Sequence, residues 1–125
     1  MLKAKMIKQS ETFNDGVLNV CQSKDGVIIE NKANSIRFGN KTYGVQRFFK
    51  VEASGNQIDR MIATPFNDFI NREDILELTD FKDNVKKLYE IVMIQKIFDS
   101  APKSLLITLK KTSINYVDRR NNQTD

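Results

Sequence analysis

The chain has 125 residues, of which 40% are hydrophobic and 29% charged, proportions typical of one soluble globular domain. It contains no histidine and one cysteine, which excludes Ser-His-Asp and Cys-His nucleophile pairs, HExxH zinc sites and an intramolecular disulfide. No apolar run approaches the roughly 20 residues of a membrane span, and MLKAKMIKQS at the N-terminus lacks the apolar core of a signal peptide. We therefore expect a cytosolic, non-enzymatic protein without a cofactor or a bound metal.

The net charge of +4 is unevenly distributed along the chain. Residues 1–10 carry three lysines and no acidic residue, and residues 101–125 carry five basic residues against two acidic ones. The central part of the chain is consequently slightly acidic. A nucleic-acid-binding domain usually carries a basic face built from its strands or helices, so this distribution favours protein partners.

The first half of the chain alternates apolar and polar residues over short runs, which predicts β-strands. After a turn at residues 13–16, residues 17–22 and 27–29 should form a hairpin around Asp25-Gly26, a pair that readily adopts positive φ. We expect residues 31–34 to be irregular and residues 35–38 to form a short strand. The longest alternation, over residues 45–53, should pair with residues 57–64 through Ser54-Gly55-Asn56, and Pro65 should end that strand.

The second half continues the same pattern. Residues 66–74 read as a connector, residues 75–78 as a short strand, and residues 80–87 as a turn with room for one short helix. The run LYEIVMIQKI at residues 88–97 is apolar on both faces, which is typical of a strand inside a barrel or sandwich or beneath a subunit contact. Leu105, Ile107 and Leu109 define the final strand.

These elements predict a mostly β fold, a single small antiparallel β-barrel or sandwich with flexible termini. The expected organisation is an N-terminal arm at residues 1–12, the folded domain at residues 13–111, and a flexible C-terminal tail at residues 112–125. Ile114, Tyr116 and Val117 give this polar tail enough apolar surface to become ordered on a partner.

Four local features are candidates for functional sites. FGNKTYG at residues 38–44 lacks the order of a phosphate loop and is better read as turns. Cys21, within an apolar run, is expected to be a buried structural cysteine. Arg47-Phe48-Phe49 could stack on nucleic-acid bases, although core packing with an ion pair from Arg47 to a carboxylate such as Asp59 is favoured. The acidic residues Asp68, Glu73, Asp74 and Glu77 could hold a divalent ion, but we favour solvated loop charge because they lack EF-hand spacing.

Taken in order, four segments resemble the head-closure proteins of long-tailed, non-contractile-tail bacteriophages and related prophages of Gram-positive bacteria. The resemblance runs from Phe13 to about Lys110. The segments are FNDGVLNVCQ, YGVQRFFKVEA, IDRMIATPFN and LYEIVMIQKIFDSAPKSLLITLKK. The third is similar to the family's I/V-D-R-L-I-x-x-P strand, and the last to its Y-x-I-x-x-I/V-Q and L-x-L-T-L strands.

The resemblance implies a small β-barrel that forms a homo-oligomeric ring in the virion neck, assembled in the bacterial host cytoplasm. The ring would bind the portal, adaptor and tail proteins, retain packaged double-stranded DNA and offer a tail attachment surface. Candidate channel-loop residues are Asn31, Lys32, Asn34, Arg37, Asn40, Lys41, Phe66, Asn67, Asp68 and Arg72. Candidate subunit or partner contacts are Phe48, Tyr89, Ile91, Met93, Ile114 and Tyr116.

Two alternatives remain open. One is a single-stranded nucleic-acid-binding β-barrel that uses Arg47, Phe48 and the basic termini. The other is a different neck or tail ring protein, such as a tail terminator, built on the same small-barrel principle.

Overall fold

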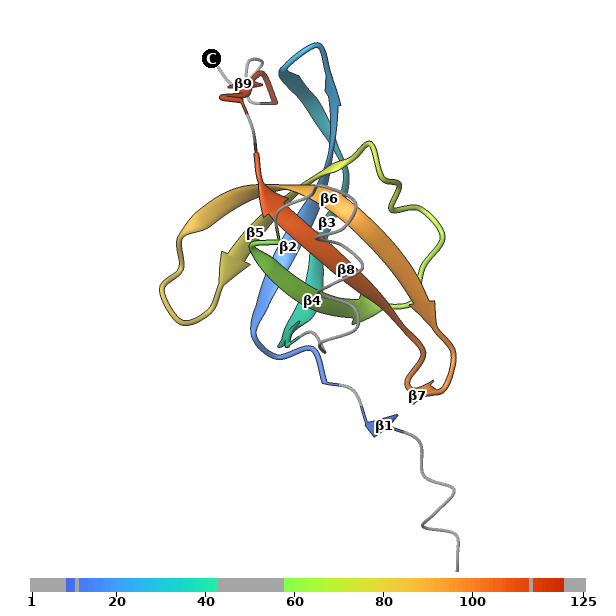
Figure 1. Ribbon diagram of the computed structural model, residues 1–125. Helices are drawn as coiled ribbons and strands as arrows, with labels where there is room; N and C mark the ends of the chain where they lie inside the picture. Colours follow the sequence, from blue (N-terminus) through green and yellow to red (C-terminus); the bar gives the residue numbers. More distant parts are fainter. Residues whose placement is uncertain (1–8, 11, 43–57, 113, 121–125) are drawn as a thin grey trace, which may run out of the picture.

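A computed structural model describes residues 9–10, 12–42, 58–112 and 114–120 of the chain. The described residues form strands and turns without a helix (Figure 1). The strands are β1 (Gln9–Ser10), β2 (Gly16–Lys24), β3 (Val27–Lys41), β4 (Arg60–Pro65), β5 (Ile75–Asp80), β6 (Lys86–Ile97), β7 (Ser100–Ala101), β8 (Ser104–Lys111) and β9 (Val117–Asp118). The predicted mostly β class is confirmed. Residues 81–83 form a turn, where the sequence left room for a short helix.

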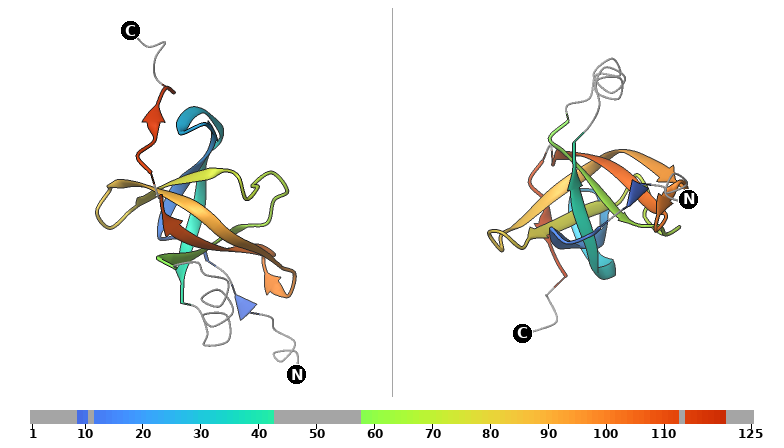
Figure 2. Two further views of the ribbon diagram at one scale, coloured as in Figure 1. Left: turned by 45° about the horizontal axis from the view of Figure 1, so that its top comes forward. Right: turned by 90° about the horizontal axis from the view of Figure 1, so that it is seen from below.

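Six of these strands close into a ring of hydrogen bonds. They pair in the order β2-β5-β6-β8-β4-β3, and β3 pairs again with β2 (Figures 1 and 2). Every pair in this ring is antiparallel. The short strands β9 and β1 are added in parallel to β3 and β7, respectively. Because the ring closes on itself, its six strands leave no long unpaired edge.

The core lies inside this ring and follows from the period-two alternation of the strands. One continuous apolar cluster fills the interior, and most of its large side chains are fully buried. Its members are Leu18, Val20, Phe38, Ile62, Ile70, Leu76, Leu78, Tyr89, Ile91, Leu105, Ile107 and Leu109. Burial of each large side chain contributes about 1.5–3 kcal/mol, so this cluster is the main source of stability.

The strand β3 is longer than its sequence predicts. The Asp25-Gly26 turn has the expected positive φ angles, 53° and 80°, and joins β2 to β3 as a hairpin. The strand then continues through residues 31–34, which were expected to be irregular. Shifts in the β2–β3 register, together with a positive φ of 57° at Ser35, accommodate these polar residues within the strand.

A bulge changes which face of β6 points inward. Tyr89 and Ile91 face the core, but the register shifts between Ile91 and Met93, and Ile94 then packs against the same core. The simple alternation expected for residues 88–97 is therefore interrupted at Val92. Tyr89 and Ile91, candidates for a subunit contact, are buried within their own chain.

Some expectations concern segments that lie outside the described residues. These are the strand at residues 45–53, the Ser54–Asn56 turn and the Arg47-Phe48-Phe49 aromatic segment.

The close packing at Gly16 provides a test of the ring. A Cβ atom at this position would lie 2.4 Å from the Thr79 carbonyl oxygen and 2.5 Å from the Phe38 ring. We expect Gly16→Ala to lower the free energy of unfolding by about 1–3 kcal/mol in urea titrations, because the backbone and the ring must move apart. Gly26→Asn is the control, since a Cβ at Gly26 would make only an ordinary van der Waals contact with Ile114, at 3.6 Å, and asparagine tolerates its positive φ. Equal stability of Gly16→Ala and the wild type would contradict this packing.

Candidate functional site

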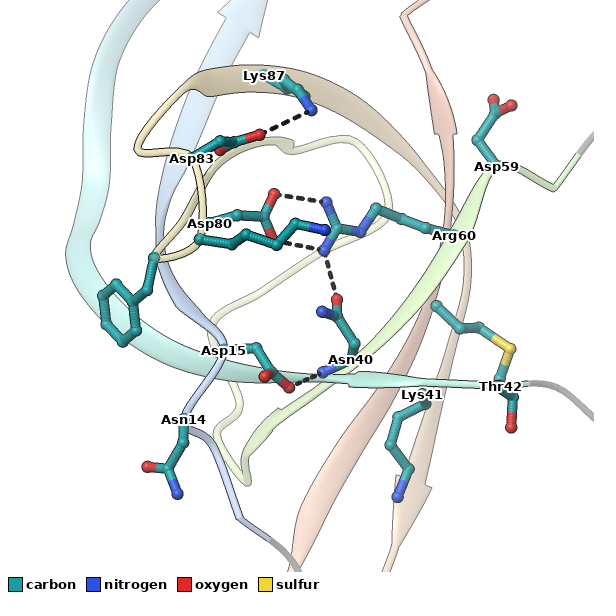
Figure 3. A pocket seen from close by; sticks show the side chains of 13 residues that line it. Asn14, Asp15, Asn40, Lys41, Thr42, Asp59, Arg60, Asp80, Asp83 and Lys87 are labelled. Carbon is teal, nitrogen blue, oxygen red and sulfur yellow. Dashed lines mark hydrogen bonds and ion pairs between the residues drawn. The ribbon is translucent and has the colours of Figure 1, made fainter.

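An ion pair spans one end of the ring. Arg60, at the start of β4, reaches across to Asp80, at the end of β5, although these two strands are not neighbours (Figure 3). Its guanidinium donates two hydrogen bonds to the carboxylate, Nη1 to Oδ2 at 3.0 Å and Nη2 to Oδ1 at 2.9 Å. Both side chains are largely buried, so this bidentate geometry is shielded from water.

Aromatic and polar neighbours hold the Arg60 guanidinium in this position. It lies over the rings of Phe38 and Tyr89, with 5.4 Å and 5.6 Å from Cζ to the ring centroids. Nη2 also donates a hydrogen bond to Asn40 Oδ1. The Asn40 backbone N–H donates in turn to Asp15 Oδ2 at 2.8 Å, which connects the cluster to the start of β2 (Figure 3).

The ion pair shifts the protonation equilibria of both partners. Hydrogen bonds from Arg60 lower the pKa of the Asp80 carboxyl, and the same bonds raise the pKa of Arg60. Both shifts favour the charged form of each partner.

A depression of about 710 Å³ lies around this ion pair. Residues of both charges line it: Asn14, Asp15, Asn40, Lys41, Thr42, Asp59, Arg60, Met61, Asp80, Phe81, Lys82, Asp83 and Lys87. Across the described residues no buried side-chain nitrogen or oxygen atom lacks a hydrogen-bond partner. Nor do three histidine, cysteine, aspartate or glutamate side chains gather there as metal ligands. Within this lining, hydrogen bonds between separate segments of the chain join Asp15 to Asn40 and Arg60 to Asn40 and Asp80.

The channel-loop candidates between residues 31 and 41 lie on β3 and not on a loop, which corrects the sequence prediction. Their side chains are held by the rest of the chain. Lys32 forms an ion pair with Asp74 at 2.7 Å, and Arg37 donates to the Phe13 carbonyl oxygen at 2.9 Å. Asn34 Oδ1 accepts a hydrogen bond from Asn31.

The remaining channel-loop candidates, Phe66, Asn67, Asp68 and Arg72, do lie in a connection, between β4 and β5. Asn67 Oδ1 accepts the backbone N–H groups of Phe69 and Ile70 at 3.2 Å and 3.3 Å, an Asx turn that shapes the segment.

The interpretation of the acidic residues as solvated loop charge is wrong for two of them. Asp74 is buried against Lys32 and also accepts the Asn71 backbone N–H at 2.8 Å. Glu77 is buried against Arg120. Sequence spacing could not reveal this, because each partner lies more than 40 residues away along the chain.

Exposed apolar side chains gather at the two ends of β6, a feature that the sequence analysis did not identify. We call Phe81 and Val85, in the turn before β6, the β5–β6 patch. We call Phe69 and Phe98, which are exposed, and Phe66, which is half-buried against the core, the β6–β8 patch. Val85 and Phe98 are 48% and 58% exposed and directly flank the strand. The two ends of β6 lie on opposite sides of the molecule in every view (Figures 1 and 2).

The β6–β8 patch is a continuous surface. The Phe66 and Phe98 rings lie 5.3 Å apart between centroids. Phe66 and Phe69 also line an apolar groove of about 470 Å³ together with Phe13, Ile36 and Pro65. Large apolar side chains that remain exposed in this way are typical of surfaces that bind other proteins.

The Arg60–Asp80 pair predicts a measurable acid dependence. The folded-state pKa of Asp80 lies below the unfolded value of about 3.9, so its contribution is complete above that pH and is lost as the pH falls through the folded-state pKa. We expect Asp80→Asn to lower the free energy of unfolding by about 2 kcal/mol at pH 7 and to weaken its fall between pH 5 and pH 3. Denaturant titrations over this pH range measure both effects.

Asp83→Asn is the matched control, because Asp83 and Lys87 form an exposed pair at 3.7 Å that should contribute less than about 0.5 kcal/mol. A steeper acid dependence in Asp80→Asn than in the wild type would contradict the assignment.

No helix of the described residues has the length and apolar character needed to cross a membrane. No protein-family model, curated protein or solved structure matches this chain.

Proposed function

We propose that this protein is a structural, non-enzymatic component of a virion neck that assembles head to tail into a ring. The ring would dock beneath a portal and adaptor, retain the packaged DNA and present a surface for the tail. The sequence resemblance supports this role, and so does the small antiparallel ring of strands, whose buried polar side-chain atoms, among the described residues, all have hydrogen-bond partners.

The position of the two apolar patches is the observation that carries the proposal. They differ from each other and lie at opposite ends of a 12-residue strand, about 40 Å of extended chain. A surface at one end of a subunit can therefore contact a different surface on the next subunit. Contacts of this heterologous kind generate rings when the rotation between subunits closes.

The size of the patches indicates how strong this contact can be. A buried aromatic side chain covers about 150–250 Å², so two small patches supply only part of the roughly 1,200 Å² of a stable interface. We therefore propose that the ring forms on the portal and adaptor, which hold neighbouring copies at high local concentration.

In this proposal the β4–β5 connection forms part of the subunit contact and does not line the DNA channel, the position that the sequence resemblance implies for it. Phe66 and Phe69 belong to that connection and to the β6–β8 patch. Residues 1–10 and 101–125 carry the excess positive charge, which suits docking onto partners.

Variants blocked at one end test the head-to-tail contact. Val85→Asp and Phe98→Asp should each stop assembly, because a charge replaces an exposed apolar side chain at one of the two patches. An equimolar mixture of the two variants should form dimers and no larger species, since only one productive contact remains. Light scattering and negative-stain microscopy, with and without the portal and adaptor proteins, measure the assembly state.

Ile29→Asp is the matched control, an exposed apolar residue on β3 away from both patches, and should assemble normally. A protein that stays monomeric and does not bind portal and adaptor would contradict the proposal.

Salt-dependent binding of single-stranded oligonucleotides that Phe48→Ala abolishes would favour the nucleic-acid-binding alternative. Binding to the tail tube in place of the adaptor would favour a tail terminator, and the identity of the adjacent genes separates the same two roles.

A further inference from the structure

The outer surface of the strand ring is covered at one place by residues close to the C-terminus. Val20 on β2 faces the core, so the next residue, Cys21, must point outward. Cys21 is nevertheless 0% exposed. It belongs to a second apolar cluster with Ile28 and Ile75, and Tyr116 packs against that cluster. Leu88 on β6 and Tyr116 near the C-terminus both pack against these outward-facing side chains, and Arg120 Nη1 lies 3.3 Å from Cys21 Sγ.

The backbone of this segment contacts the edge of β3. The strand β9 is only two residues long and runs parallel to β3. The Val117 N–H donates to the Gly26 carbonyl oxygen at 2.9 Å, and the Arg119 N–H donates to the Ile28 carbonyl oxygen at 3.0 Å. Addition of an extended segment to an exposed strand edge is a common mode of peptide recognition.

Arg120 anchors the segment. Its Nη1 and Nη2 atoms donate to the two Glu77 carboxylate oxygens at 2.9 Å and 3.0 Å, the bidentate geometry that favours arginine over lysine. Nη1 also donates to Asn31 Oδ1 at 3.0 Å. Asp118, in the same segment, accepts from Nε at 2.9 Å. The Arg120 side chain is only 13% exposed.

The strand ring itself shapes the receiving site for this guanidinium. Asn19 on β2 lies opposite Glu77 on β5 and donates to Glu77 Oε1 at 3.0 Å, which fixes the carboxylate. The Asn31 Nδ2 group donates to Asn34 Oδ1 at 2.6 Å, so the side-chain oxygen Oδ1 of Asn31 is directed at Arg120. None of these orienting residues belongs to the C-terminal segment.

By contrast, the two residues directly before this segment are little buried. Ile114 and Asn115 are exposed, and Val117 remains 54% exposed even within β9. The segment is therefore held mainly by Tyr116, the two backbone hydrogen bonds and Arg120.

We propose that the outer face of β2, β3 and β5 is a peptide-binding site for an extended segment with a tyrosine and an arginine four positions apart. Residues 116–120 of the chain occupy it as an exchangeable ligand. The same segment supplied in trans, as a peptide or by a second copy of the chain, would compete for the site. This proposal does not depend on ring assembly.

Cys21 reports on occupancy of the site. Burial raises the pKa of its thiol to about 11, so at pH 8 only about one thiol in a thousand is ionised. Arg120 Nη1 also lies 3.3 Å from Sγ. Departure of the segment would expose the thiol and return its pKa towards about 8.5, and both changes accelerate reaction with a disulfide reagent.

The test measures Cys21 labelling by a chromogenic aromatic disulfide at pH 8, in full-length protein at concentrations where it is monomeric. We expect Arg120→Gln to label at least tenfold faster than the wild type. Arg119→Gln, its exposed neighbour, is the matched control and should label at the wild-type rate. A synthetic peptide of residues 114–120 should saturably restore slow labelling of Arg120→Gln, whereas the same peptide carrying Arg120→Gln should not.

Two results would overturn the proposal. If folded Arg120→Gln labels as slowly as the wild type, the segment is not what protects Cys21. If it labels rapidly and the peptide gives no protection, the segment is a fixed part of the fold and not an exchangeable ligand. Circular dichroism establishes that each variant is folded. Should Arg120→Gln fail to fold, Arg120→Lys keeps the charge, loses the bidentate bond and must label at an intermediate rate. Because the assay uses monomers, its failure would leave the ring proposal intact.

Discussion

The structure depends on one long strand that closes the ring. β3 pairs with β2 over one part of its length and with β4 over another, and β9 adds to the same strand. Without the β2–β3 pairing, the other strands would form an open sheet with two free edges and an unfilled interior face. The register shifts within β3 let a polar, asparagine-rich sequence make this closure while Phe38 still reaches the centre of the core.

Two arginines complement the ring by joining elements that backbone pairing does not connect. Arg60 joins β4 to the end of β5, and Arg120 joins the C-terminal segment to the middle of β5. Arg60 makes a bidentate bond to Asp80, and Arg120 makes one to Glu77 and also bonds Asp118; both arginines are largely shielded from water. Separating the partners of such a pair would leave an uncompensated buried charge. The ion pairs therefore favour the arrangement in which the elements that carry the partners lie together.

These hydrogen bonds and ion pairs within the chain bear on the functional proposal. The buried polar side-chain atoms of the described residues already have hydrogen-bond partners, and two features of the outer surface are apolar: the patches at the two ends of β6 and the outer face covered by the C-terminal segment. Surfaces of this kind recognise other proteins. We therefore propose that this protein acts by binding other proteins, through the ring contacts and through the peptide site. The charged clusters stabilise the fold of the subunit.

Local sequence was enough to predict the strand class, the Asp25-Gly26 hairpin, the end of β4 at Pro65 and the inward face of β8, because turn chemistry and period-two alternation act over a few residues. It also predicted that Cys21 is buried, although the residues that cover it come from the far end of the chain. The continuity of β3, the bulge in β6 and the pairing of Arg60 with Asp80 and of Arg120 with Glu77 depend on which strands become neighbours. The two residues of these ion pairs lie 20 and 43 positions apart in the sequence, respectively. Local sequence patterns cannot predict such contacts, because they form only when the ring of strands closes.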